Sequence, residues 1–229
     1  MNVSVIGTGN MGSALVRRLI TGGNTVYVAG SSLKKAQALA AELKGQGPGS
    51  VEAVSDRDAA ARGDVVILAT WYPVATRLAV ELSDTLRGKI VVDITNPFNE
   101  TYDALITDDN TSAGEEIQRR LPGSSVVKAF NTNFAPVLGD GEIDGVKIDV
   151  FLACDDDAAK AIVGELVNAA GLRAVNAGAL ANARLLERIA LFMVELQGRY
   201  GLGFQAAMKF FPARSLPLLA PVEPQAALA

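Results

Sequence analysis

The stretch "SVIGTGNMGSALVRRL", residues 4–19, decides the fold of this chain. An apolar run leads into three glycines, Gly7, Gly9 and Gly12, and a segment of helical periodicity follows them at once. The G-x-G-x-x-G spacing often occurs by chance, but between a buried strand and a helix it indicates a specialised turn. Gly7 allows the turn, Gly9 leaves the backbone open to a ligand, and Gly12 lets helix and strand pack closely. The alternative is a plain strand-to-helix turn.

Outward from this turn, short apolar runs alternate with longer segments of helical periodicity. The runs that predict strands are residues 3–7, 25–30, 64–70, 89–95, 125–130, 147–154 and 172–178. The segments that predict helices between them are residues 11–21, 33–44, 73–86 and 156–170. Strands that are apolar throughout and alternate with helices are typical of a parallel sheet covered on both faces. We therefore predict an α/β fold, a doubly wound parallel Rossmann sheet of about eight strands with a small C-terminal helical part.

The character of the chain changes after Gly178. Residues 182–203 have apolar side chains on nearly every side of a helix, and the run from Ile189 to Val194 is wholly apolar. Such a helix is either buried against its own domain or packed on a second subunit, and we expect a homodimer. The proline-rich stretch 212–229 either lies across that subunit or is disordered. We divide the chain into a Rossmann domain, residues 1–178, and a C-terminal helical segment with its tail, residues 179–229.

The composition excludes several functions. Its 25 acidic side chains outnumber 21 basic ones, so the chain lacks the basic face that nucleic acid or an anionic membrane requires. No apolar run approaches a membrane span and no leader pattern is visible, so we expect a cytoplasmic protein. Histidine is absent, which excludes Ser-His-Asp and Cys-His catalysis and histidine-ligated metals. Cys154, the single cysteine, follows an apolar run and is expected to lie in the core.

The stretch "AGSSLKK", residues 29–35, where the second strand should end, indicates which dinucleotide binds. An NAD-binding fold normally has an Asp or Glu here for the ribose hydroxyls, but the first carboxylate of the chain is Glu42. A 2′-phosphate would instead meet the hydroxyls of Ser31 and Ser32, with the ammonium group of Lys35 nearby. The stretch therefore predicts NADP(H), although it could merely cap a helix. The residues expected to hold the other phosphates are those of the glycine turn, namely Gly7, Thr8, Gly9, Asn10, Met11 and Gly12.

The reacting rings are expected over the carboxyl ends of later strands, where ligands of open α/β sheets bind. Those ends carry aromatic side chains that can enclose a flat ring, and amides or hydroxyls that can bond to a heterocycle. The candidate residues are Thr70, Trp71, Asn96, Asn131 and Thr132. For any one of them, loop capping or packing at the rim is nearly as good an explanation.

No side chain is expected to act as an essential general acid or base. The Tyr-x-x-x-Lys pair of short-chain dehydrogenases does not follow any tyrosine of the chain. If a proton donor were needed, Asp93, Lys128 and Tyr72 would be the first candidates, because each lies on or next to a strand end facing the expected cleft. The acids of "CDDD", residues 154–157, lack the spacing of metal ligands, and we expect them to open a helix rather than to bind a metal.

Together these motifs make the chain similar to the NADP oxidoreductases that use the deazaflavin coenzyme F420, a family related to the reductase domain of eukaryotic metalloreductases. The resemblance spans residues 1 to about 211 and rests on "VIGTGNMGSALVRRL", "AGSS", "DVVILAT", "KIVVDITNP" and "VVKAFNT", and above all on "GLRAVNAGALANARLLE" and "GLGFQAAMKFF". It implies NADP binding by Thr8 to Met11, Ser31, Ser32 and Lys35, with Thr70, Trp71, Asn131 and Thr132 near the reacting rings. The chain departs from the family at Ser32, where an arginine is usual, and at Asn131, where archaeal members carry a histidine.

The leading hypothesis is an NADP(H)-dependent oxidoreductase that exchanges hydride between NADPH and a deazaflavin, coenzyme F420, or a flavin. Such a transfer needs close stacking and exclusion of water, which a site without histidine can supply. Two alternatives stay open. The first is an NADPH-dependent reductase of another small acceptor, such as an imine, a quinone or a ferric chelate. The second is an NADPH-binding sensor without turnover.

Overall fold

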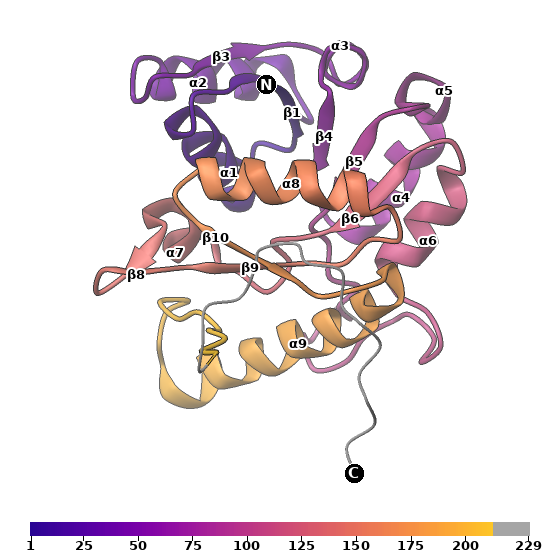
Figure 1. Ribbon diagram of the computed structural model, residues 1–229, viewed down its shortest axis with the longest axis vertical. Helices are drawn as coiled ribbons and strands as arrows, with labels where there is room; N and C mark the ends of the chain where they lie inside the picture. Colours follow the sequence, from indigo (N-terminus) through magenta and orange to yellow (C-terminus); the bar gives the residue numbers. More distant parts are fainter. Residues whose placement is uncertain (213–229) are drawn as a thin grey trace.

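A six-stranded parallel sheet forms the centre of the computed structural model, which describes residues 1–212 (Figure 1). Its strands are β1 (Asn2–Ile6), β2 (Thr25–Ala29), β3 (Ser50–Ala53), β4 (Val65–Leu68), β5 (Ile90–Asp93) and β6 (Ser125–Lys128). They lie in the order β3-β2-β1-β4-β5-β6, so the chain reverses direction across the sheet between β1 and β4. In open α/β sheets the ligand crevice lies at such a reversal, outside the carboxyl ends of the strands.

Helices cover both faces of this sheet, which confirms the predicted doubly wound fold. Successive strand residues alternate between two hydrophobic clusters; Val65 belongs to one and Val66 to the other. The first cluster takes side chains from α1 (Asn10–Thr21), α2 (Leu33–Leu43), α7 (Ala135–Asp140) and α8 (Asp157–Ala169). The second takes them from α3 (Asp56–Arg62), α4 (Tyr72–Glu81), α5 (Ser83–Leu86) and α6 (Ala113–Arg120). The carboxyl ends of the strands are thus left for loops and helix starts.

The structure differs from the sequence prediction at the edges of the sheet. The last two predicted strands, β9 (Asp149–Leu152) and β10 (Arg173–Asn176), pair in parallel with each other and not with the main sheet. A single antiparallel bridge, from Lys128 to Ala153, joins them to β6. Parallel pairing with β6 would need a long crossover, and α7 has only six residues. At the other edge β3 was not predicted, because its sequence "SVEA" is half polar and half exposed.

Two smaller features also escaped the sequence prediction. A hairpin of β7 (Glu142–Ile143) and β8 (Val146–Lys147) turns at Asp144 and Gly145, whose φ angles of 50° and 77° suit a tight two-residue turn. The predicted helix 73–86 is divided into α4 and α5, because the backbone of Leu82 departs from helical geometry with φ −106° and ψ 6°.

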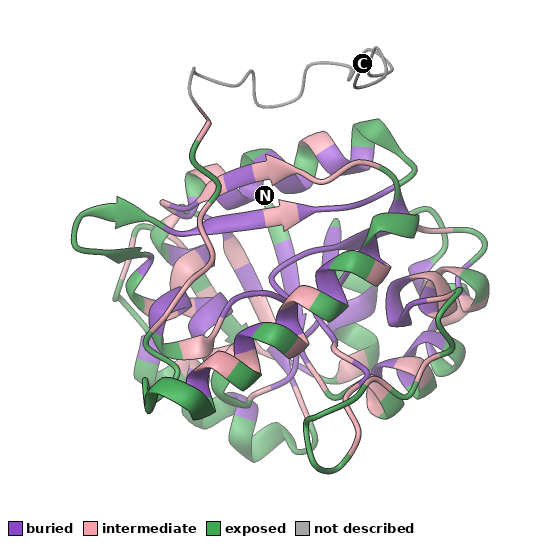
Figure 2. Ribbon diagram, turned by 90° about the horizontal axis from the view of Figure 1, so that it is seen from below, coloured by how far each residue is buried: buried purple, intermediate pink, exposed green. Residues whose placement is uncertain are grey.

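The C-terminal part consists of a short 3-10 helix, η1 (Leu180–Asn182), and α9 (Ala183–Tyr200), which lies against α6. Figure 2 looks onto this side of the molecule, where the helix presents buried, intermediate and exposed positions in turn. Leu180 and Ala183 join the second hydrophobic cluster, so the start of the helical part shares the core of the sheet domain. No helix within residues 1–212 is long and apolar enough to cross a membrane.

After α9 the chain turns back toward β9. Gly201, Gly203 and Phe204 all have positive φ angles, which reverses the chain within four residues. The buried carboxylate of Asp149 then accepts hydrogen bonds from the Lys209 ammonium at 2.5 Å, the Phe210 N–H at 2.9 Å and the Arg173 guanidinium at 2.7 Å. We call these four residues, Asp149, Arg173, Lys209 and Phe210, the Asp149 clasp. The predicted tail, apart from Pro212, lies outside the described residues.

Candidate active site

The glycine turn between β1 and α1 has the geometry that its sequence predicts. Gly7 has φ +144°, and a Cβ placed on it would lie 2.0 Å from the carbonyl oxygen of Ala69 at the end of β4. A Cβ on Gly12 would lie 2.0 Å from the carbonyl oxygen of Gly7. Both collisions are with backbone, which cannot move aside as a flexible side chain could. Only glycine therefore fits at these two positions.

Gly9 is glycine for a different reason. Its φ of −80° suits any residue, and a Cβ placed on it would meet no atom within 4 Å. The same residue is the N-cap of α1, and within the described chain no side chain caps this helix and no acidic residue lies in its first turn. The first N–H groups of a helix have no partner inside the helix and attract anions. The open space at Gly9 therefore leads directly to an anion-binding helix start, with Thr8, Asn10 and Met11 around it.

The carboxyl end of β2 lies beside the glycine turn. A Cβ on Gly30 would come within 2.9 Å of the Thr8 side chain, so the two segments are in contact. Ser31, Ser32 and Lys35 follow, and all three are exposed. The Ser32 hydroxyl accepts the Lys35 N–H at 3.3 Å and is the N-cap of α2. The helix-capping alternative therefore holds for Ser32, while no acidic residue lies in the first turn of α2.

Aromatic side chains gather at the carboxyl ends of β4 and β5. Trp71 is the N-cap of α4 and is 64% exposed, and its ring meets that of Tyr102 edge-to-face with centroids 6.2 Å apart. Tyr102 meets Phe98 in the same way at 5.8 Å. Sequence reasoning missed Tyr102, because it lies in an irregular polar stretch without periodicity. Thr70, between Trp71 and β4, is half-buried.

The ends of β5 and β6 are joined by an amide pair. Asn96 donates through its Nδ2 to the backbone oxygen of Asn131 at 2.8 Å, and Asn131 donates through its Nδ2 to Asn96 Oδ1 at 3.0 Å. Asn131 is only 5% exposed, and its Oδ1 has no hydrogen-bond partner among the described residues. Thr132 is buried beside it. Because buried polar atoms are normally paired, the free oxygen of Asn131 suits a donor on a bound ligand.

A buried ion cluster of Lys128, Asp93 and Glu187 lies next to this amide pair. The Lys128 ammonium donates to Asp93 Oδ2 at 2.8 Å and to Glu187 Oε1 at 2.7 Å, and all three side chains are 0% exposed. Burial by itself would lower the pKa of Lys128, but the charges of the two carboxylates outweigh burial and raise it. Burial raises the pKa of Glu187, because Lys128 offsets it only in part. Lys128 is therefore held as the ammonium ion.

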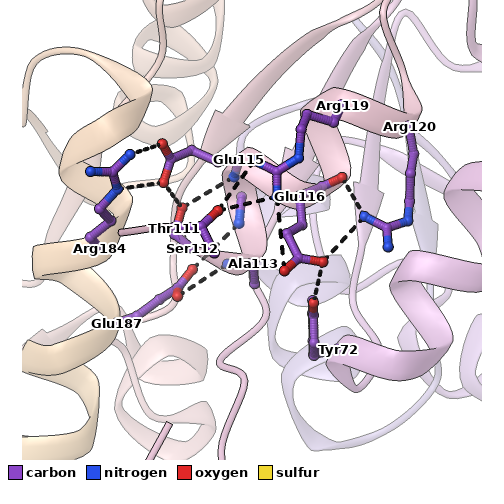
Figure 3. Close-up of polar contacts among 11 residues, drawn as sticks. Tyr72, Thr111, Ser112, Ala113, Glu115, Glu116, Arg119, Arg120, Arg184 and Glu187 are labelled. Atoms are coloured by element: carbon purple, nitrogen blue, oxygen red, sulfur yellow. Dashed lines mark hydrogen bonds and ion pairs between the residues drawn. The ribbon is translucent and has the colours of Figure 1, made fainter. Parts of the chain in front are cut away.

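The expectation that Asp93 and Lys128 face the cleft is wrong, and the third candidate, Tyr72, is half-buried and engaged with a protein partner. The first two are fully enclosed and engaged with each other, and Lys128 also donates to Glu187 on α9, while α6 packs against β6. The Tyr72 hydroxyl donates to Glu116 Oε2 at 2.7 Å (Figure 3), and burial together with this carboxylate raises the pKa of Tyr72 to about 12. Its phenol is a poor acid near neutral pH. The polar contact of Lys128 with Glu187 on α9 was also missed, because Glu187 is one of several charged side chains on this helix and nothing in the sequence marks it as the buried one.

Two further predictions concern the segment after β9. Cys154 is buried, and burial raises the pKa of its thiol, as expected of a core residue. Asp156 is the N-cap of α8 and accepts the N–H groups of Ala158 and Ala159 at 2.9 and 3.1 Å. Asp156 and Asp157 therefore open a helix as predicted, whereas Asp155 accepts the N–H of Leu180 at 2.9 Å.

The chain is similar to known proteins along most of its length. The family described as "NADP oxidoreductase coenzyme F420-dependent" matches residues 2–97. This range runs from β1 to just past β5 and includes Asn96 of the amide pair. The crystal structure of a candidate F420-dependent NADP reductase from Arthrobacter superposes with a TM-score of 0.76 and 29% identity, and covers 87% of this chain and 94% of that one. The rat metalloreductase STEAP3 is 30% identical over 82% of this chain and 36% of its own length.

A second relative is similar to this chain over a longer stretch, which includes most of the C-terminal part. The F420-dependent NADP reductase of Methanocaldococcus jannaschii is 31% identical over 211 residues, which cover 87% of this chain and 94% of the relative. An alignment of this length extends well beyond the 96 residues that the family description matches. Such identity along nearly the whole of both chains means that this chain belongs to the family of F420-dependent NADP reductases.

Proposed function

We propose that the protein binds NADP(H) and exchanges hydride between NADPH and coenzyme F420. The observation that carries the proposal is the uncapped start of α1 at Gly9, beside a β2 end that offers hydroxyls and an ammonium group but no carboxylate. The family relatives named F420-dependent NADP reductases support the acceptor. When both ligands are bound, NADPH supplies a hydride that coenzyme F420 accepts.

The residues present fit a dinucleotide that crosses the carboxyl ends of the strands. The backbone N–H groups at the start of α1 bind its diphosphate in the space that a Cβ on Gly9 would fill. Ser31 and Lys35 bind the 2′-phosphate, and Ser32 holds the start of α2 in place beside them. The free Oδ1 of Asn131 accepts a hydrogen bond from the nicotinamide end. The residues we assign to this site are Gly7, Thr8, Gly9, Asn10, Met11, Gly12, Ser31, Ser32, Lys35, Thr70, Trp71, Asn96, Asn131 and Thr132.

The chain's own contribution to the reaction is placement and exclusion of water. Trp71, Tyr102 and Phe98 form an aromatic wall against which a flat acceptor ring can lie. We assign no side chain as general acid or base. The ionisable groups nearest to the strand ends, Asp93, Lys128 and Tyr72, are engaged with protein partners.

The test is turnover with a panel of acceptors. NADPH is mixed with the protein, and absorbance of the dihydronicotinamide is followed with coenzyme F420, FMN, FAD and a ferric chelate in turn. We expect turnover with coenzyme F420 at least tenfold faster than with any other acceptor. Faster turnover with a flavin or a chelate would assign another acceptor, and tight NADPH binding without turnover would make the protein a sensor.

We infer in addition that the chain forms a homodimer in which α9 packs on the α9 of the second subunit. In this proposal residues 1–178 form the Rossmann domain, and residues 179–229 form the C-terminal segment that makes the dimer. Leu185 and Phe192 are 56% and 51% exposed, and Ile189 and Leu196 continue the same side of the helix at half-buried positions. These four side chains form an apolar stripe on α9, and the stripes of two subunits would shield each other from water. The lone buried thiol of Cys154 agrees with a reducing compartment, and we place the protein in the cytoplasm.

The dimer is tested by light scattering at micromolar concentration. The wild type is expected at twice the mass of one chain, and Ile189→Glu at the mass of a monomer because it sets a charge in the apolar stripe. Glu195→Gln, at an exposed position of the same helix, is the control and should stay dimeric. A monomeric wild type would contradict the inference.

A further inference from the structure

Lys128 connects parts of the chain that are far apart in sequence. Besides Asp93 on β5 and Glu187 on α9, its ammonium group donates to the backbone oxygen of Thr95 at 2.5 Å. Glu187 in turn accepts the N–H groups of Ala113 and Gly114, the first residues of α6 (Figure 3). One buried amine thereby links the end of the sheet, the loop after β5, the start of α6 and the C-terminal helix.

Stability alone does not explain this cluster. It contains one cation and two carboxylates, all of them 0% exposed, and apolar side chains of similar volume are often at least as stabilising in such places. Apolar side chains, however, could not form hydrogen bonds with both the N–H and the oxygen of a backbone residue. Asp93 Oδ1 accepts the Thr95 N–H at 2.9 Å while Lys128 donates to the Thr95 oxygen. The backbone of Thr95 is therefore fixed in both directions.

The fixed backbone sets the orientation of the amide pair one residue later. Because the backbone oxygen of Asn131 can only accept, Asn96 must turn its Nδ2 toward it, and Asn96 Oδ1 then faces Asn131. Asn131 must meet that oxygen with its own Nδ2, which leaves Asn131 Oδ1 as a buried acceptor without a partner among the described residues. The series of contacts thus ends on an atom that can bind only a donor.

We propose that Lys128 is a positioning residue, which presets Asn131 Oδ1 to accept the carboxamide N–H of the nicotinamide ring. This proposal rests on the proposed function, because it places the nicotinamide at the ends of β5 and β6. In this proposal Glu187 both holds the start of α6 and helps to fix the position of Lys128. Because α9 reaches the site through the lysine, the helical part and the ring end of the cleft are coupled. Lys128 itself touches no ligand.

The test compares NADPH with 2′-phospho-ADP-ribose, which is the same molecule without its nicotinamide. Lys128→Met combined with Glu187→Gln removes one charge of each sign, and Glu187→Gln alone is the reference that keeps the Thr95 contact. We expect the ratio of NADPH affinity to 2′-phospho-ADP-ribose affinity to fall at least fivefold between reference and double variant. The affinity for 2′-phospho-ADP-ribose should itself stay within twofold, and kcat with coenzyme F420 should fall at least tenfold.

Lys160→Met is the matched control. Lys160 is another buried lysine, whose ammonium donates to the backbone oxygens of Cys154 and Gly178 at 2.9 and 3.1 Å and has no bond to the amide pair. Its loss should lower the melting temperature and leave the affinity ratio within twofold of the wild type. An equal fall of the ratio in Lys160→Met would mean a general effect of lost stability and would overturn the proposal.

A second variant keeps the proposal testable if the double variant does not fold. Asn96→Ala leaves the ion cluster intact but removes the oxygen that accepts the Asn131 Nδ2, so it should reduce the affinity ratio as strongly. An unchanged ratio in either variant overturns the proposal. The ratio needs no hydride acceptor, so a wild type that fails to reduce coenzyme F420 refutes the proposed function without deciding this one.

Discussion

The two ends of the proposed NADP(H) site are built in opposite ways. At the end proposed to bind the diphosphate, which we call the diphosphate end, the site is formed by backbone and by the absence of side chains, since Gly7 and Gly12 have no room for a Cβ and Gly9 opens on empty space. At the ring end, the site is formed by side chains, and Asn131 is oriented by partners that reach back to a buried lysine. The first end depends on a local motif of six residues, and the second on contacts between segments far apart in the chain.

The largest expected effect comes from adding one methyl group at the diphosphate end. Gly7→Ala and Gly12→Ala each place a Cβ 2.0 Å from a backbone oxygen, and at Gly7 the positive φ adds strain. We expect the free energy of unfolding to fall by at least about 4 kcal/mol, as measured by denaturant titration. A loss below about 1 kcal/mol would mean that the turn can relax, and that the contrast with the ring end is weaker than the structure indicates.

Gly9→Ala separates ligand binding from folding at the same turn. The new Cβ meets no protein atom within 4 Å, so the variant should unfold at nearly the wild-type denaturant concentration. It occupies space assigned to the diphosphate, and NADPH affinity measured by calorimetry should fall about 30-fold, or about 2 kcal/mol. Unchanged affinity would place the diphosphate elsewhere.

Ser31→Asp tests the end of β2, between the two extremes. We expect the wild type to prefer NADPH over NADH by at least about tenfold, or about 1.4 kcal/mol. The new carboxylate should repel the 2′-phosphate and accept the ribose hydroxyls, which reverses the preference. Ser31→Ala is the control and should weaken NADPH binding without improving NADH. Equal affinities of the wild type for the two cofactors would contradict the assignment of NADP(H).

The smallest effect is expected from Trp71→Ala at the ring end. Trp71 is exposed and supports no core, so the fold should be unaffected. Loss of an enclosing aromatic face should raise KM for coenzyme F420 roughly fivefold, or about 1 kcal/mol, with a smaller change in kcat. The pH profiles of Trp71→Ala and Asn131→Ala should show no ionisation absent from the wild type. A new ionisation would reveal an acid or base that the structure does not identify.

The geometry of the glycine turn could be predicted from the sequence, because strand, glycine spacing and helix are adjacent, and Gly7 and Gly12 each have a local steric reason to be glycine. Sequence reasoning also found Asn96 and Asn131 as residue types at strand ends. It could not find their mutual bonds or the role of Lys128, since these depend on β5, β6 and α9 coming together. From the sequence, Lys128 was predicted to be a polar residue that faces a cleft. The structure shows that its side chain is buried and bonded to Glu187 of α9. The pairing of β9 with β10 was out of reach for a similar reason, because periodicity describes a strand but not its neighbour.

The Asp149 clasp has a consequence for the order in which the molecule folds. Lys209 and Asp149 are 60 positions apart, and the chain between them forms α8, β10 and α9. Closing so long a loop carries an entropic cost that only a formed β9–β10 pair and a docked α9 can offset. The segment after α9 is therefore expected to dock last and to open first, giving its amides fast hydrogen exchange while those of β1 and β4 stay protected. Deuterium would thus enter the clasp through brief local openings and reach the central strands only when the whole sheet unfolds.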